Sequence, residues 1–171
     1  HLLRDAVELR FLRSDVAVAA YLSGGIDSSA ITAYIKQFTD RELHTFSIAF
    51  ADPDYDESRY QYAMADFFGT EHHIVSATNP EIGAAFPDAV WHAETPILRT
   101  APAPMYLLSQ LVQEHGIKVV VTGEGADETL AGYNIFKENK VRRFWAKDPH
   151  SQMRPALLRR LYPYIPALQR G

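Results

Sequence analysis

Residues 22–29 place two glycines, three serines and one aspartate directly after a short apolar run. Adjacent glycines let the backbone turn sharply and approach a ligand closely. Small polar residues then open a helix, so we expect the amides of Asp27, Ser28 and Ser29 to point out of its N-terminus and form an anion site. A carboxylate such as that of Asp27 suits a phosphate site when a magnesium ion lies between the two groups. This loop therefore predicts a binding site for phosphate groups and magnesium, although it lacks the lysine of a Walker loop.

A second loop, residues 122–128, carries three carboxylates close together. Glycines flank Glu124 and leave its carboxylate uncrowded, while Asp127 and Glu128 open the next helix, where the helix dipole favours negative charge. Neighbouring acids repel one another unless a cation or a cationic substrate lies between them. The pattern is typical either of a capped helix start or of a site that binds a cation.

Apolar periodicity indicates which elements position these two loops. The predicted strands are residues 16–22, 43–50, 72–76 and 117–122; the predicted helices are residues 2–13, 28–38, 56–68, 79–91 and 102–115, with another from about 127. Alternation of strands and helices predicts the α/β class, with a doubly wound parallel sheet covered by helices on both faces. Because both loops follow strands, we expect them at the same edge of the sheet.

Composition and charge exclude several function classes. The 171 residues contain no cysteine, which excludes a disulfide framework, a zinc site with cysteine ligands and a cysteine nucleophile. No apolar run is long enough to span a membrane, and we expect a cytoplasmic protein. Residues 1–133 carry 8 Lys and Arg against 19 Asp and Glu, a net charge of −11, which argues against nucleic-acid binding. Residues 134–171 carry 9 against 2, a net charge of +7, and four prolines interrupt them: Pro149, Pro155, Pro163 and Pro166.

Two neighbouring histidines, His72 and His73, raise the question of a metal site. They lie on a predicted strand, where consecutive side chains point to opposite faces. We therefore expect no metal site from this pair.

Together the two loops resemble a known family. SGGIDSS (residues 23–29) resembles the pyrophosphate-binding signature of the N-type ATP pyrophosphatases, and TGEGADETLAGY (residues 122–133) resembles the SGEGSDE-type motif of the glutamine-dependent asparagine synthetases. The strings YLSGGIDSS, TFSIAF, YDES, GTEHHIV and PMYLLS follow the order of that family's synthetase domain. The resemblance covers most of residues 3–136 and implies an adenine-nucleotide alpha-hydrolase-like fold, a Rossmann-like three-layer sandwich.

The resemblance also implies residue roles. The first loop would hold the β,γ-phosphates of ATP and Mg²⁺ through six residues: Ser23, Gly24, Gly25, Asp27, Ser28 and Ser29. Adenosine would contact backbone groups of Leu22, Ile48 and Gly123. Glu124 would be the catalytic base that accepts a proton from attacking ammonia, and Asp127 would bind magnesium or pyrophosphate. Asp56 or Glu57 would assist at the nucleotide end.

The implied reaction is the ATP-dependent amidation of aspartate to asparagine through β-aspartyl-AMP, with release of AMP and pyrophosphate. Residues 1–133 would form the ATP-pyrophosphatase synthetase core, and residues 134–171 a basic helical tail. The family's N-terminal glutaminase domain, which supplies ammonia, has no match here, nor have its Arg-rich helix and late catalytic lysine. We therefore expect a fragment of a larger protein that binds nucleotide weakly and makes no asparagine alone.

Other interpretations stay open. An adenylating synthetase with another acceptor, as in β-lactam formation, would share the nucleotide loops and differ in the substrate pocket. That pocket is expected at residues 94–102, where Arg99 would hold a substrate carboxylate or lie on the surface. RNA modification needs a basic groove, which the charge of −11 disfavours, and a binding module without chemistry is disfavoured by the intact Asp27, Glu124 and Asp127. A homodimer through exposed apolar helix faces is also open.

Overall fold

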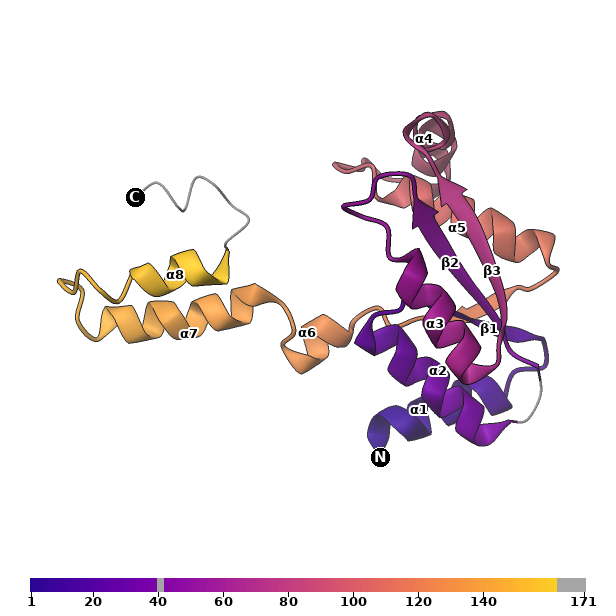
Figure 1. The fold of residues 1–171 in the computed structure, drawn as a ribbon, viewed down its shortest axis with the longest axis horizontal. Helices are drawn as coiled ribbons and strands as arrows, with labels where there is room; N and C mark the ends of the chain where they lie inside the picture. Colours follow the sequence, from indigo (N-terminus) through magenta and orange to yellow (C-terminus); the bar gives the residue numbers. More distant parts are fainter. Residues whose placement is uncertain (40–41, 163–171) are drawn as a thin grey trace. The chain divides into compact units, whose positions relative to one another are not determined.

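The computed structural model describes residues 1–39 and 42–162, and the chain forms two compact units, residues 1–123 and 124–171. The strands of the first unit are β1 (Val18–Tyr21), β2 (His44–Phe50), β3 (Glu71–Ala77) and β4 (Val119–Val121). Its helices are α1 (Leu2–Leu12), α2 (Ile26–Phe38), α3 (Ser58–Phe68), α4 (Asn79–Ala93) and α5 (Pro102–Glu114) (Figure 1). The predicted elements of this unit are thus confirmed in type and order.

The four strands form one parallel sheet in the order β3-β2-β1-β4. The chain builds outward from β1 through β2 to β3 and then returns to add β4 on the other side of β1. Strand order therefore reverses at β1, and ligands of such sheets bind beyond the carboxyl ends of the strands at this point. The doubly wound parallel sheet predicted from the sequence is confirmed.

Helices cover both faces of the sheet. The first face carries Ala20, Thr45, Ser47 and His72; the second face carries Ala19, His44, Phe46 and His73. On the first face, α1 and α2 bury an apolar cluster around Ala20, made of Val7, Ile31, Ile35 and Leu43. On the second face, α5 buries Leu108 and Val112 against Ala19 and Phe46. Helix α3 packs on the first face against β2 and β3, and α4 packs on α5.

Several element boundaries differ from the prediction by one or two residues, and two of these shifts bear on the first glycine loop or have a visible cause. Strand β1 begins at Val18 rather than at Val16, because the Ser14 hydroxyl accepts a hydrogen bond from the Val16 amide (3.3 Å) and donates to its carbonyl (3.0 Å). Helix α2 begins at Ile26, two residues before the predicted start, with Gly25 as its N-cap. The earlier start changes which amides are free at the first glycine loop.

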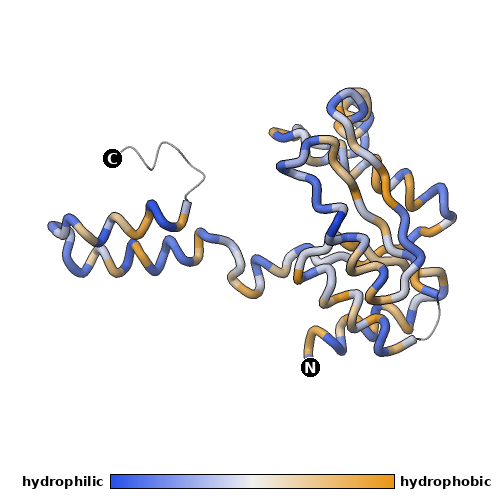
Figure 2. Tube along the Cα trace, viewed as in Figure 1, coloured by the Kyte–Doolittle hydropathy of each residue, from blue (hydrophilic) through white to orange (hydrophobic). Residues whose placement is uncertain are grey.

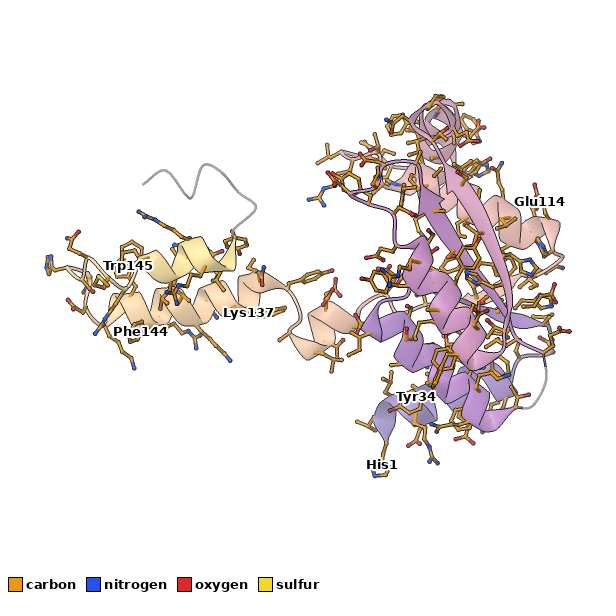
Figure 3. The ribbon with its side chains drawn as sticks, in the orientation of Figure 1. His1, Tyr34, Glu114, Lys137, Phe144 and Trp145 are labelled. Atoms are coloured by element: carbon orange, nitrogen blue, oxygen red, sulfur yellow. The ribbon has the colours of Figure 1, made fainter. Side chains whose placement is uncertain are left out.

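The second unit contains α6 (Ala126–Leu130), α7 (Asn134–Ala146) and α8 (Ala156–Leu161). Helices α7 and α8 pair through the Tyr162 hydroxyl, which donates to Glu138 (2.6 Å), and through Arg154, whose guanidinium lies 4.5 Å from the centre of the Phe144 ring. None of the residues in these three helices is buried, and Figure 2 shows hydrophilic and hydrophobic residues interspersed along α7 and α8. Lys137, Phe144 and Trp145 mark α7 in Figure 3.

The prolines of the basic tail divide into two groups. Pro149 and Pro155 lie between α7 and α8, whereas Pro163 and Pro166 lie outside the described residues. The division of a core (residues 1–133) from a tail (residues 134–171) stays a prediction. Within the described parts of both units, no helix is long and apolar enough to cross a membrane.

Candidate nucleotide site

The loop between β1 and α2 is folded around the hydroxyl of Ser28. This hydroxyl accepts a hydrogen bond from the Ser23 amide (3.1 Å), donates to the Gly25 carbonyl (3.2 Å) and lies 2.9 Å from the Ser23 hydroxyl. The Ser23 hydroxyl in turn accepts from the Gly25 amide (3.2 Å). Since Ser28 is only 7% exposed, its side chain shapes the loop from within.

The free amides at the start of α2 are those of Ile26, Asp27 and Ser28, because the first turn of a helix has no carbonyls for them. The expectation that the Ser29 amide points outward is wrong. This amide donates to the Gly25 carbonyl (3.1 Å), since the helix begins earlier than the sequence suggested. Asp27 is half-buried in the first turn, beside the positive end of the helix dipole.

The Ser29 side chain is in a different situation from that of Ser28. Within the described part of the chain, the buried Ser29 hydroxyl oxygen has no hydrogen-bond partner. A buried hydroxyl is normally satisfied in a folded protein. The Ser29 hydroxyl therefore has a hydrogen-bonding capacity that the described residues leave unused.

Two glycines allow close backbone contacts around this loop. Gly24 has φ +80°, and a Cβ there would lie 2.7 Å from the Cβ of Tyr60 at the start of α3. A Cβ on Gly123 would lie 3.0 Å from the Ser28 amide nitrogen and 3.2 Å from the Asp27 Cβ. The chain leaving β4 thus runs against the first turn of α2, so the start of the second loop meets the first loop at one edge, as predicted.

The expected adenosine contacts lie beside this loop and are partly engaged. Leu22 is fully buried and its amide donates to the Phe46 carbonyl (3.0 Å). The Ile48 carbonyl accepts from the side-chain amide of Gln61 (2.9 Å), whose oxygen accepts from the Ser47 hydroxyl (3.0 Å). Gln61, which is 3% exposed, was not among the residues predicted from the sequence. Gln61 lies four residues before the buried Ala65, and this spacing puts both residues on the same face of the helix. That spacing is the sequence signal that could have indicated a buried Gln61.

Behind these contacts, the first face of the sheet carries a buried polar chain. The His72 ring bonds the Thr45 hydroxyl through Nδ1 (2.8 Å) and the Ser47 hydroxyl through Nε2 (3.0 Å). Thr45 also bonds the Thr70 hydroxyl (2.8 Å). Burial lowers the pKa of His72, and the neighbouring His73 lowers that pKa further. Both effects favour the neutral ring, in which one nitrogen donates and the other accepts.

Asp56 organises the connection from β2 to α3. Its carboxylate accepts from the Ser58 hydroxyl (2.7 Å) and from the amides of Ser58 and Phe50 (3.3 Å each). These bonds, above all that from the Ser58 hydroxyl, lower the pKa of Asp56. Asp56 and Glu57 were the two candidates expected to assist at the nucleotide end. Asp56 fixes the connection from β2 to α3, whereas Glu57 is exposed at the N-cap of α3.

A cavity of about 590 Å³ opens beyond the carboxyl ends of β2 and β3. Phe50, Ala77, Tyr55 and Asn79 are among the residues that line it. Thr100 and Ala101, from the segment 94–102 that the sequence assigned to a substrate pocket, also line it. Arg99, the candidate carboxylate ligand in that segment, is exposed.

The second-loop carboxylates belong to the second unit. Glu124 is exposed, and Asp127 is half-buried in the first turn of α6, where its carboxylate lies directly over Gly132. Glu128 accepts a hydrogen bond from the Tyr133 hydroxyl (3.1 Å), which raises the pKa of Tyr133. Glu128 is thus engaged within its own loop. The expected roles of Glu124 and Asp127 at the first loop stay predictions.

Comparison with known proteins gives one family match and several relatives. The family model described as asparagine synthase matches residues 1–170. The chain is 37% identical over 134 residues to the glutamine-hydrolyzing asparagine synthetase 1 of Bacillus subtilis, covering 78% of this chain and 21% of that protein. It is 36% identical over 149 residues to amidase chyE of Penicillium rubens, covering 79% of this chain and 22% of that protein.

Among solved structures, the NH3-dependent NAD synthetase of Campylobacter jejuni aligns with a TM-score of 0.51 at 17% identity, covering 77% of this chain and 58% of that chain. This likeness concerns the fold and confirms the adenine-nucleotide alpha-hydrolase-like class. The chain spans about a fifth of the length of the curated relatives named above. Since the family model nevertheless covers almost all of its residues, the chain belongs to the asparagine synthase family.

Proposed function

We propose that this chain forms the nucleotide-binding and adenylating part of a synthetase that uses ATP to convert aspartate into asparagine, releasing AMP and pyrophosphate. The observation that carries the proposal is the loop of residues 23–29, whose helix start is open to an anion and lies against the backbone of Gly123. Family membership supports the same chemistry. The ammonia would come from a glutaminase domain of the whole protein, in the cytoplasm, without nucleic-acid or membrane partners.

The first loop supplies a site for pyrophosphate. Three amides at the start of α2 carry the partial positive charge of the helix dipole, and anions bind readily at such a terminus. Ser23, Gly24 and Gly25 form the turn that lets phosphate oxygens approach these amides. The buried Ser29 hydroxyl would gain its partner from a phosphate oxygen.

Magnesium fits the donors of this loop. The Asp27 carboxylate stands beside amides that favour phosphate, and carboxylate and phosphate oxygens are the ligands that Mg²⁺ prefers. Asp27 would hold the ion, with Asp127 of the second loop as a further ligand. When bound, Mg²⁺ neutralises the charge that pyrophosphate carries as it leaves.

The residues of the chain then act in two steps. The side-chain carboxylate of aspartate attacks the α-phosphorus of ATP, and pyrophosphate leaves toward the loop amides. Ammonia attacks the carbonyl of β-aspartyl-AMP; Glu124 accepts a proton from it, and AMP leaves. Leu22, Ile48 and Gly123 would hold adenosine, with Gln61 fixing the Ile48 carbonyl.

Calorimetric titration of Mg-ATP into the chain tests the phosphate site. We expect Asp27→Asn to weaken binding of Mg-ATP by about 10- to 100-fold, the range for losing one contact to a charged group. Binding of AMP should stay unchanged, and so should Mg-ATP binding by the exposed control Asp88→Asn. Mg-ATP that binds no better than AMP, or equally well to Asp27→Asn, would contradict the assignment of the triphosphate to this loop.

A pair of glycine variants tests the shape of the loop. Gly24 and Gly69 both have positive φ, but only at Gly24 would a Cβ meet a neighbour. Gly69→Ala should cost about 1–2 kcal/mol of stability from backbone strain alone and leave Mg-ATP binding intact. Gly24→Ala should abolish that binding, because the loop must move away from Tyr60. If Gly24→Ala and Gly69→Ala bind Mg-ATP with equal affinity, Gly24 is not part of the nucleotide site.

A second candidate keeps the adenylation and changes the acceptor. It is favoured by the cavity beside Thr100 and Ala101 and by the relative named as an amidase. Pyrophosphate release by the full-length protein distinguishes the two. Release that depends on aspartate and ammonia supports asparagine formation, whereas release that depends on another carboxylic acid supports the second candidate.

A further inference from the structure

The amino ends of β2 and β3 bring two histidines and a glutamate together. His44 is the first residue of β2, Glu71 is the first residue of β3, and His73 follows two residues later. The parallel register pairs His44 with Glu71 and Phe46 with His73, so all these side chains lie on the second face of the sheet. Glu114, the last residue of α5, is labelled in Figure 3, and the next residue, His115, contacts His73. The corner is at the opposite edge from the nucleotide loop.

Three polar side chains bring their ligand atoms close together at this corner. His44 Nδ1 lies 3.1 Å from His73 Nε2 and 3.4 Å from one oxygen of Glu71. His73 Nε2 lies 3.4 Å from the other oxygen of Glu71. Tetrahedral zinc has bonds of about 2.0–2.1 Å to nitrogen and oxygen, which puts its ligand atoms about 3.3 Å apart. The two nitrogens, and each nitrogen with its nearer Glu71 oxygen, are thus close to this spacing. With one ligand atom taken from each residue, all three lie within 4.8 Å of one another.

Aromatic packing holds the imidazoles in place. The His73 ring stacks on Phe46, with ring centres 4.9 Å apart, and lies 4.0 Å from the ring of His115. His115 is itself fixed, because its Nδ1 donates to the Leu111 carbonyl (2.8 Å). The His73 ring therefore has little side-chain freedom left to lose when a ligand binds, which favours affinity.

The corner is also open and correctly charged for a cation. The side chains of His44 and Glu71 are 34% and 45% exposed, whereas that of His73 is 16% exposed. An ion can therefore enter from solvent and keep a water molecule as its fourth ligand. Glu71 supplies an acidic side chain beside the two imidazoles, which suits a cation.

We propose that His44, Glu71 and His73 form a binding site for a divalent transition metal ion of the zinc type. Two imidazole nitrogens and one carboxylate oxygen are a donor set that zinc takes and that magnesium does not favour. The ion joins the first residue of β2 to the beginning of β3. It is independent of the magnesium proposed at the nucleotide loop, because the two places lie at opposite edges of the sheet.

Calorimetric titration of Zn²⁺ tests the site, using the metal-stripped chain without a histidine tag, without nucleotide and with excess Mg²⁺ present. We expect one ion per chain. His73→Gln and Glu71→Gln should weaken binding by more than about 100-fold, the upper end of the loss for an outer-shell partner. His72→Gln is the matched control, because the neighbouring histidine lies on the first face; the exposed His150→Gln is a second control. Both should bind Zn²⁺ as the unaltered chain does.

A spectroscopic measurement on the unaltered chain decides the case even if a variant fails to fold. Co²⁺ bound at this site should give the intense visible absorption of a tetrahedral ion, and Zn²⁺ should displace it. Nitrogen NMR should show Zn²⁺ shifting His44 Nδ1 and His73 Nε2, while both nitrogens of His72 stay in place. Absence of stoichiometric binding, or shifts confined to other histidines, overturns the proposal. In that outcome the three groups form a hydrogen-bonded cluster only, and the nucleotide site is unaffected.

Discussion

Strands β2 and β3 carry polar side chains on both of their faces, and the two sets are held in different ways. On the first face, His72 bonds two hydroxyls through its two ring nitrogens. Gln61 extends this set of hydrogen bonds by donating to the Ile48 carbonyl. On the second face, His44 and His73 turn their nitrogens toward each other and toward Glu71 at an open corner. The same residue type therefore serves as an internal hydrogen-bonding group on one face and as a candidate ligand on the other.

The difference arises from strand alternation and from what covers each face. Neighbouring residues of a strand point to opposite faces, so the dipeptide of His72 and His73 is divided between two environments. Helix α3 brings Gln61 over the first face and seals it. On the second face, His73 packs against Phe46 and His115, and the Glu71 side of the corner stays open to solvent. A polar group that is fully paired and buried supports the fold, whereas polar groups gathered at an open edge can take a ligand.

The largest loss of stability should come from removing the Gln61 side chain from the buried hydrogen-bond network. Gln61→Ala leaves the Ser47 hydroxyl and the Ile48 carbonyl each without one partner, and such losses cost about 1–3 kcal/mol apiece. We expect the free energy of unfolding in urea to fall by about 2–4 kcal/mol and Mg-ATP binding to weaken. The exposed Gln110→Ala on α5 is the control. A loss no larger than that of Gln110→Ala would show that the chain of hydrogen bonds adds nothing to stability.

A smaller effect should separate the two neighbouring histidines. With a metal chelator present, His72→Leu should lower the free energy of unfolding by about 1–2 kcal/mol. This loss is smaller than that of Gln61→Ala, because the Thr45 hydroxyl still bonds Thr70 and the Ser47 hydroxyl still bonds Gln61. His73→Leu should cost under about 1 kcal/mol, since its ring packs on Phe46 and leucine replaces that contact. Equal losses of unfolding free energy in His72→Leu and His73→Leu would show that the two histidines do not differ in their contribution to stability.

The fold was largely predictable because its signals are local. Apolar runs mark the strands, and the glycines at 69 and 116 follow the ends of α3 and α5 closely. Two of the boundary shifts have a visible local cause: the Ser14 hydroxyl bonds the Val16 backbone before β1, and Gly25 is the N-cap of α2. That second shift is why the Ser29 amide was assigned wrongly.

The candidate site was predictable only in part, because only its local parts leave a signal in the sequence. The first glycine loop is continuous in sequence, so its residues and their edge of the sheet could be inferred. Gln61 and the corner of His44, Glu71 and His73 depend on helix packing and on strand register between segments far apart in the chain. The sequence correctly puts His72 and His73 on opposite faces, but it does not say that His44 meets His73.

The smallest effect should come from Asp56, which starts the helix that covers the first face. Its pKa is lowered below the usual 3.8, so it stabilises the folded chain above that value, and this contribution is lost as the pH falls through the lowered pKa. Asp56→Asn should therefore lower the urea midpoint slightly at about pH 6, with the difference vanishing at strongly acidic pH. The exposed Asp54→Asn in the same loop is the matched control. Because α3 covers only the first face, Zn²⁺ affinity measured at neutral pH should be equal in Asp56→Asn and the unaltered chain, and a change in that affinity would mean that the two faces are coupled.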